Sequence, residues 1–244
     1  MKILLISDAL YDFVDIDEKR KYKWGDKLPE YMGKNDAIIL DFSFINSERV
    51  LTIKQNLNLL QEILTEKNID QDNLIIVVVC GSKKEEYSEK PKSTDEGTAK
   101  DKLEKRYSYD FLENIIPEYE KRVEFCDCER DFEQLSIKHI SVRQYLDLAQ
   151  KYYLFFRYNS DAESCVNIFP LAKTKKGSNA CVAFELRIKR GIVIVLPGYD
   201  DDKIEKVGSS LIKICRNYFK VREGCFMASN CCCSLQGFKQ SQRR

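Results

Sequence analysis

Three short runs of mainly apolar residues constrain the fold of this chain more than any other feature of its sequence. They cover residues 2–6 (KILLI), 36–42 (DAIILDF) and 74–79 (LIIVVV). Continuous apolar runs of this length are typical of strands that are buried on both faces of a parallel sheet, whereas half-exposed strands alternate apolar and polar residues. The three runs therefore predict a central parallel sheet.

A helical repeat lies between the second and third runs. Apolar residues recur there at spacings of three and four, at Val50, Ile53, Leu57, Leu60 and Leu64. A strand, a helix and a strand in this order form a βαβ unit, for which a right-handed crossover is expected. The link between the first two strands is less regular, and we expect a turn at residues 24–26 and a short helix near residues 29–32.

The segment 177–219 has the pattern of the end of an open α/β sheet. Strands are predicted at residues 181–188 and 192–196, joined by a turn at residues 189–191 in which Gly191 is able to take a positive φ. A helix is predicted from about residue 202 to residue 219, because three aspartates stand where its dipole is positive. The whole pattern predicts a three-layer α/β fold with a mainly parallel sheet and a late antiparallel hairpin.

The expected organisation is one domain with two irregular parts. Residues 1–222 form the predicted α/β domain, and residues 82–104 read as a mobile insertion because they hold almost no large apolar side chain. Residues 223–244 are predicted to be a cysteine-rich, disordered tail. Aromatic residues at 152–156 and the run 166–169 predict two further strands between the insertion and the late hairpin.

Charge and hydropathy narrow the classes of partner. Lys and Arg total 40 against 39 for Asp and Glu, so the net charge is +1 and no overall field attracts nucleic acid or an anionic membrane. The first residues are too short an apolar run for a signal peptide, and no run approaches the length of a membrane span. We expect a soluble, cytoplasmic protein whose partner is another protein or a small ligand, and no cofactor.

Ten cysteines is a high count for such a chain. In a reducing compartment most should act as small buried hydrophobic residues. Structural zinc needs ligands held at tetrahedral spacing, and adjacent thiols cannot easily converge on one ion. We therefore predict no metal site, and the pattern leaves open the role of four cysteines near the end of the chain, Cys225, Cys231, Cys232 and Cys233.

Cys80 and His139 are the candidates for catalysis. A cysteine at the end of a parallel strand, just before Gly81, has the position of a nucleophile on a strand-to-helix turn. Such a thiol needs a base, and His139 is the single histidine of the chain. The sequence also allows Cys80 to be an ordinary buried residue and His139 to be a surface residue.

Polar residues follow each of the three predicted strands. Because parallel strands end at one edge of a sheet, these residues form a candidate ligand-binding site, open to Mg²⁺ and phosphate. They can equally form turns and helix caps, and neither a G-x-G-x-x-G loop nor a Walker-type loop is present. The candidate residues are Ser7, Asp8, Asp41, Ser43, Gly81 and Ser82.

The order of these elements resembles a class I glutamine-amidotransferase-like domain. The resemblance rests on KILLIS, DAIILDFSF, VVVCGS and the late GIVIVLP segment, and it implies a flavodoxin-like fold. Active members of that family carry G-x-C-x-G and a late His-x-Glu. Here Val78 and Ser82 replace the two glycines, and residues 197–199 (PGY) stand in place of the late motif.

The resemblance therefore implies a degenerate domain without the catalytic triad. We expect a non-catalytic domain that binds a partner or ligand, in a prokaryotic defence or signalling system. Two alternatives remain: a cysteine hydrolase that uses Cys80 and His139, and a binder of nucleotides or phosphate at the strand-end loops.

Overall fold

The structure is a computed structural model of the whole chain. It describes residues 1–45, 55–60, 74–80, 111, 123–129, 132–134, 140–148, 152–158, 168–174, 180–188, 191–199 and 201–236. Of residues 222–236 it describes the backbone alone. The predicted insertion at 82–104 lies outside the described residues.

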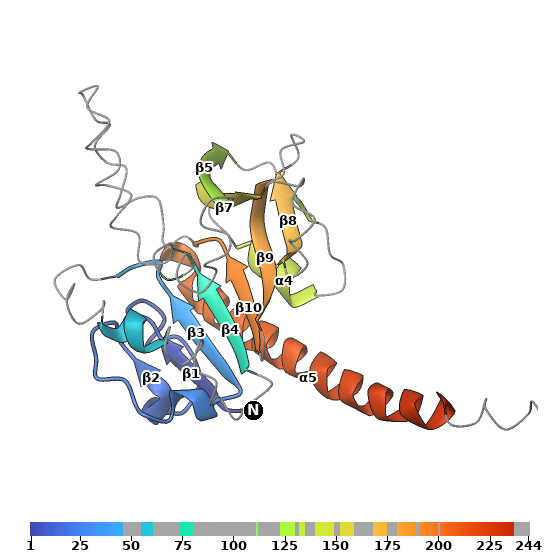
Figure 1. Cartoon of the computed structure of the whole chain (residues 1–244). Coiled ribbons are helices and arrows are strands. Elements are labelled where there is room, and N and C mark those ends of the chain that lie inside the picture. The colour runs from blue at the N-terminus through green and yellow to red at the C-terminus, as the bar shows by residue number, and fades with distance from the viewer. Residues whose placement is uncertain are drawn as a thin grey trace, which may run out of the picture.

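Within these ranges the strands form a ten-stranded mixed sheet with the main order β2-β1-β3-β4-β10-β9-β7-β5 (Figure 1). The first five strands of this order are parallel to one another, and the strand pairs from β10 onward are antiparallel. The parallel strands are β1 (Ile3–Ile6), β2 (Lys21–Tyr22), β3 (Ala37–Asp41), β4 (Leu74–Val79) and β10 (Gly191–Leu196).

The antiparallel part of the sheet extends from β10. β9 pairs with β10, and both β7 and β8 pair with β9, while β5 and β6 lie beyond them. These strands are β5 (Val123–Glu129), β6 (Phe132–Gln134), β7 (Tyr152–Tyr158), β8 (Ile168–Thr174) and β9 (Ala180–Ile188). The α/β class, the parallel sheet and the late antiparallel hairpin predicted from the sequence are confirmed.

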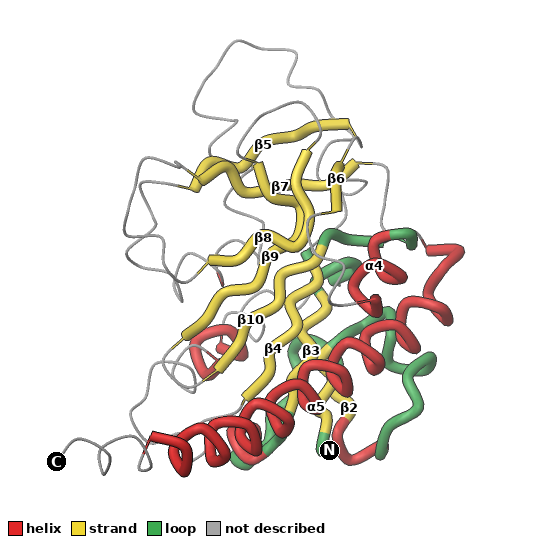
Figure 2. The backbone as a smooth tube through the Cα atoms, turned by 90° about the vertical axis from the view of Figure 1, so that its right-hand side faces the viewer, coloured by secondary structure: helices red, strands yellow, loops and turns green. Residues whose placement is uncertain are grey.

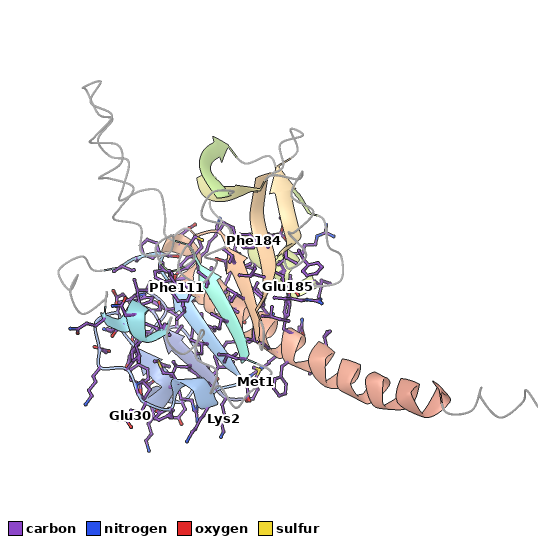
Figure 3. All side chains as sticks on the ribbon, viewed as in Figure 1. Met1, Lys2, Glu30, Phe111, Phe184 and Glu185 are labelled. Atoms are coloured by element: carbon purple, nitrogen blue, oxygen red, sulfur yellow. The ribbon has the colours of Figure 1, made fainter. Side chains whose placement is uncertain are left out.

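Both faces of the parallel sheet are covered, so the molecule has three layers (Figures 1 and 2). The alternation of side chains along β1, β3 and β4 sends neighbouring residues into two separate apolar clusters. One cluster contains residues of α4 (Ile140–Leu146) and α5 (Ile204–Gln236). The other contains Trp24, Leu57 and Phe111, and Figure 3 shows Phe111 close to the sheet.

The connection from β1 to β3 is built of short elements, as its irregular sequence predicted. It contains two short 3-10 helices, η1 (Glu18–Arg20) and η2 (Met32–Lys34), and the edge strand β2 between them. The predicted turn at residues 24–26 is confirmed: Gly25 has a φ of 87°, and the Asp26 amide donates to the Lys23 carbonyl at 3.1 Å.

The sequence placed Gly191 in the turn, and this prediction is wrong because the residue belongs to the strand. Gly191 is the first residue of β10 and pairs with both Ile188 and Leu74, and it is not among the described glycines with a positive φ. A Cβ atom at this position would lie 2.8 Å from the Leu74 carbonyl oxygen. A glycine is therefore needed here because two strand backbones approach closely, not because of a left-handed turn.

The last helix differs from its prediction at the C-terminal end. After a 3-10 turn, η6 (Asp201–Lys203), α5 starts at Ile204 and continues to Gln236, into residues for which the sequence predicted a disordered tail from position 223. A helix held by packing along its first half extends at little cost per residue, and no proline interrupts residues 204–236. Among the described helices, none has the length and apolar character needed to cross a membrane.

Candidate functional site

The carboxyl ends of β1, β3, β4 and β10 meet at one edge of the sheet. In open α/β sheets ligands bind at this edge, at the point where the strand order reverses. Here the chain passes from β1 to β2 on one side and then to β3 on the other side, so the reversal lies between β1 and β3. The residues at these two strand ends, Ser7 and Asp41, therefore occupy the position of a ligand site.

Asp41 is at the centre of a hydrogen-bonded network at this edge. Its Oδ2 atom accepts hydrogen bonds from the Ser7 hydroxyl at 2.6 Å and from the Tyr199 hydroxyl at 2.7 Å. Its Oδ1 atom accepts from the backbone amide of Ser43 at 3.0 Å. We call Ser7, Asp41, Ser43 and Tyr199 the Asp41 network.

The surrounding chain satisfies the remaining polar groups. The Ser7 hydroxyl accepts a hydrogen bond from the Leu10 amide at 2.8 Å, and the backbone carbonyl of Asp41 accepts one from the Trp24 indole at 2.6 Å. The Ser43 hydroxyl lies 3.5 Å from the Cys80 carbonyl oxygen, to which it donates. The network is therefore tied to the loops after β1, β3 and β4.

Tyr199 reaches the network because the loop after β10 is fixed in place. The hydroxyl of Tyr145, on α4, donates to the Pro197 carbonyl at 2.6 Å. The ring of Tyr199 packs edge-on against Phe44, with 5.6 Å between the ring centroids. Residues that are distant in sequence thus hold a phenol directly over the end of β3.

The whole network is removed from solvent. Asp41 is 1% exposed, Ser43 is 2% exposed, and Ser7 and Tyr199 are fully buried. Burial of a carboxylate disfavours its charged form, while hydrogen bonds donated to it favour that form. Burial is the larger effect and raises the pKa of Asp41, and the hydrogen bonds from Ser7, Tyr199 and Ser43 oppose it.

The two tyrosines respond to the same environment. Burial raises the pKa of Tyr199 far above its usual value, and the neighbouring Asp41 carboxyl adds to this effect. Burial also raises the pKa of Tyr145, again with contributions from Asp41 and from Cys80. Both phenols therefore act as neutral hydrogen-bond donors at physiological pH.

Cys80 lies at the end of β4 but faces the opposite layer. Its side chain is 3% exposed and belongs to the apolar cluster that contains Trp24 and Phe111, whereas Tyr145 and Tyr199 belong to the other cluster. The Cys80 amide donates to the Leu196 carbonyl at 2.9 Å and so continues the pairing of β4 with β10. The thiol has the surroundings of a packed core residue.

Of the candidate ligand-binding residues, the structure brings Ser7, Asp41 and Ser43 into direct contact. The Asp8 carboxylate accepts a hydrogen bond from the amide of Trp24, whose indole donates to the Asp41 carbonyl, at 3.0 and 2.6 Å. Gly81, Ser82 and His139 lie outside the described residues. Within the part of the chain that the structure describes, no three His, Cys, Asp or Glu side chains are grouped so as to hold a metal ion.

Sequence reasoning missed Tyr199, Tyr145 and Trp24. Tyr199 follows the last buried strand, so the parallel topology already places its loop at the correct edge of the sheet. The sequence, however, marks this loop only by the absence of a His-x-Glu motif. Trp24 was assigned to a turn, and nothing in the helical pattern around Tyr145 marks a hydroxyl that reaches a loop 52 residues later.

Comparisons with known proteins assign no family or function to this site. No protein-family model matches the chain. No curated protein is significantly similar to it in sequence. The mixed α/β sheet is consistent with a Rossmann-like or flavodoxin-like fold, and it assigns no family.

Proposed function

We propose that this chain is a non-catalytic domain that binds a partner protein. The observation that supports it most strongly is the state of Asp41, the residue at the reversal of the strand order. Three donors already occupy its carboxylate oxygens, and the group is 1% exposed. A buried polar network in which every member has a partner stabilises a fold and leaves no free group for chemistry.

The same network argues against a phosphate or nucleotide at this edge. Phosphate sites present backbone amides and hydroxyls outward, near cations or a helix N-terminus. Here the Ser7 and Tyr199 hydroxyls donate inward to Asp41, and the Ser43 amide does the same. A bound phosphate would face the Asp41 carboxyl and would have to displace these donors.

The cysteine-hydrolase alternative requires a thiol that substrate can reach. The 3% exposure of Cys80 and its place in an apolar cluster keep the thiol out of reach of a substrate. The partner it would need, His139, lies outside the described residues. The geometry therefore favours a structural role for Cys80.

A rigid aromatic surface at the β2 edge supports binding of a protein. The hydroxyls of Tyr22 and Tyr31 lie 3.3 Å apart, and both donate to the Lys19 carbonyl, at 3.0 and 3.1 Å. Along the same edge strand and just after it, the amino groups of Lys21 and Lys23 lie 5.9 and 5.1 Å from the ring centroid of Tyr11. Tyrosines held in place with cations nearby are typical anchors of protein interfaces.

Glutamine hydrolysis tests the non-catalytic part of the proposal. Ammonia release is measured with the wild-type chain and with Cys80→Ala, and we expect both to equal the buffer blank. Release by the wild type that disappears in Cys80→Ala would overturn the proposal.

The partner surface is tested by cross-linking in cells that encode this chain. Tagged wild type is compared with Tyr31→Ala and with Glu30→Ala, a neighbouring exposed control. We expect a cross-linked protein that the wild type and the control retain and that Tyr31→Ala loses. Equal yields from all three would contradict a role for this surface.

A further inference from the structure

The apolar stripe of α5 continues beyond the body of the protein. Its spacing alternates strictly between three and four residues over the length of the helix. The stripe comprises Val207, Leu211, Ile214, Tyr218, Val221, Cys225, Ala228, Cys232 and Leu235. We call these residues the α5 stripe.

The first half of the stripe is covered by the sheet and the second half leaves it. Val207, Leu211, Ile214 and Tyr218 are buried, at 0–3% exposure, whereas Val221 is 52% exposed. Beyond this point α5 projects away from the strands in both views, and no other described element runs beside it (Figures 1 and 2). At 1.5 Å per residue, the projecting part is roughly 22 Å long.

The repeat is also compatible with a neighbouring helix along the projecting part, which the sheet does not reach. A straight α-helix drifts relative to a strict seven-residue repeat, so an unbroken 3–4 spacing matches a neighbouring helix wound around it. Residues 224–236 contain no charged side chain, in a chain of which 32% is charged. Coiled coils between different chains usually select their partner by charges beside the seam, and this segment offers none.

These features favour a second copy of the same helix. Three successive stripe positions, Cys225, Ala228 and Cys232, hold small residues, which let two helices approach closely. The proposed segment carries only Arg222 and Glu223, of opposite sign, so two copies do not repel each other, and the net charge of +1 opposes association of two chains only weakly. We propose that the projecting part of α5, residues 221–236, pairs with the same segment of a second chain to form a homodimer. This inference does not depend on the proposed function.

The oligomeric state of the full chain in a reducing buffer tests this proposal, since disulfides between the cysteines are then excluded. Light scattering after size exclusion should give twice 28.5 kDa for the wild type. Ala228→Glu places a charge in the stripe and should lower the mass to 28.5 kDa. Asn230→Glu, on the opposite side of the helix, should leave the dimer intact.

Glutamate is a good helix former, so both variants should keep the helical circular-dichroism signal of the wild type. If Ala228→Glu loses that signal, a second pair of variants nearer the end of the helix gives the same comparison. Leu235→Glu places the charge in the stripe, and Ser234→Glu is its control outside the stripe. A wild type that stays monomeric at every concentration overturns the proposal. A monomeric wild type that sediments with anionic vesicles overturns it as well, because the helix would then bind a membrane surface and not a second copy. A dimer that survives the stripe substitutions, or that both members of a pair disrupt equally, also overturns it.

Discussion

Replacing Tyr199 by phenylalanine removes one hydroxyl from the Asp41 network and leaves the ring in place. The lost hydrogen bond is 2.7 Å long and fully buried, and its acceptor is a carboxyl group. Hydrogen bonds to charged groups contribute about 1.5–3 kcal/mol, so we expect a loss of about 2 kcal/mol of unfolding free energy. For a chain of this size the melting temperature should fall by roughly 4–8 °C.

Tyr22→Phe is the matched control, because it removes the same atom from a hydrogen bond that is exposed to solvent. The Tyr22 hydroxyl donates to the Lys19 carbonyl at 3.0 Å in contact with water. Water can replace this bond, so the expected loss is below about 0.5 kcal/mol. Urea denaturation of both variants and the wild type measures the difference.

The effect of Tyr199→Phe should also depend on pH. The Tyr199 hydroxyl lowers the pKa of Asp41 against the larger effect of burial, so its removal raises that pKa further. The folded variant then holds the Asp41 proton more tightly, and it loses more stability than the wild type as the pH rises from acid to neutral. A loss equal to that of Tyr22→Phe, or one that does not grow with pH, would refute the reasoning.

Three further predictions concern Asp41, Gly191 and Cys215. The pKa of Asp41 is higher in the folded chain than in the unfolded chain, so its contribution to stability is fully present below the unfolded pKa and is lost as the pH rises through the folded pKa. Asp41→Asn should flatten this pH dependence of stability, measured by urea titrations over a pH series. A slope equal to that of the wild type would count against the prediction. Gly191→Ala should cost about 1–3 kcal/mol in urea denaturation, because its Cβ would lie 2.8 Å from the Leu74 carbonyl oxygen, and wild-type stability would contradict this. Cys215 should resist brief alkylation until the protein unfolds, since it is fully buried and burial raises its pKa to about 12; peptide mass spectrometry that finds it modified in the native protein would contradict the packing of α5.

The parallel sheet was predictable because burial on both faces leaves a direct trace in the sequence. β1, β3 and β4 match the three apolar runs closely, and β9 and β10 match the predicted hairpin. Periodicity also gave the first half of α5. The predicted helix ended too early, because small cysteines, serines and an alanine give a weaker apolar contrast beyond residue 223 although the 3–4 spacing and the helical backbone continue.

The Asp41 network was only half predictable. Parallel topology brings Ser7, Asp41 and Ser43 to one edge, and the sequence placed them there together. It could not show that a phenol 158 residues away would close over them. That contact depends on how the loop after β10 is held by Tyr145 and Phe44, which are tertiary contacts without a local sequence pattern.

The glycine at position 191 shows a different limit. A glycine between two predicted strands suggests a turn, and the local rules for hairpins favour that interpretation. The reason for the glycine lies on another strand, in the carbonyl of Leu74. Contacts of this kind appear only when β10 is placed beside β4.

Thermal denaturation in the presence of inorganic phosphate and a panel of nucleotides tests the central claim most directly. If the Asp41 network is a filled structural element, the melting temperature of the wild type stays constant as each compound is added, because nothing binds the folded state preferentially. A concentration-dependent rise that Asp41→Asn abolishes would show that the edge of the sheet is a working ligand site, and it would contradict the account.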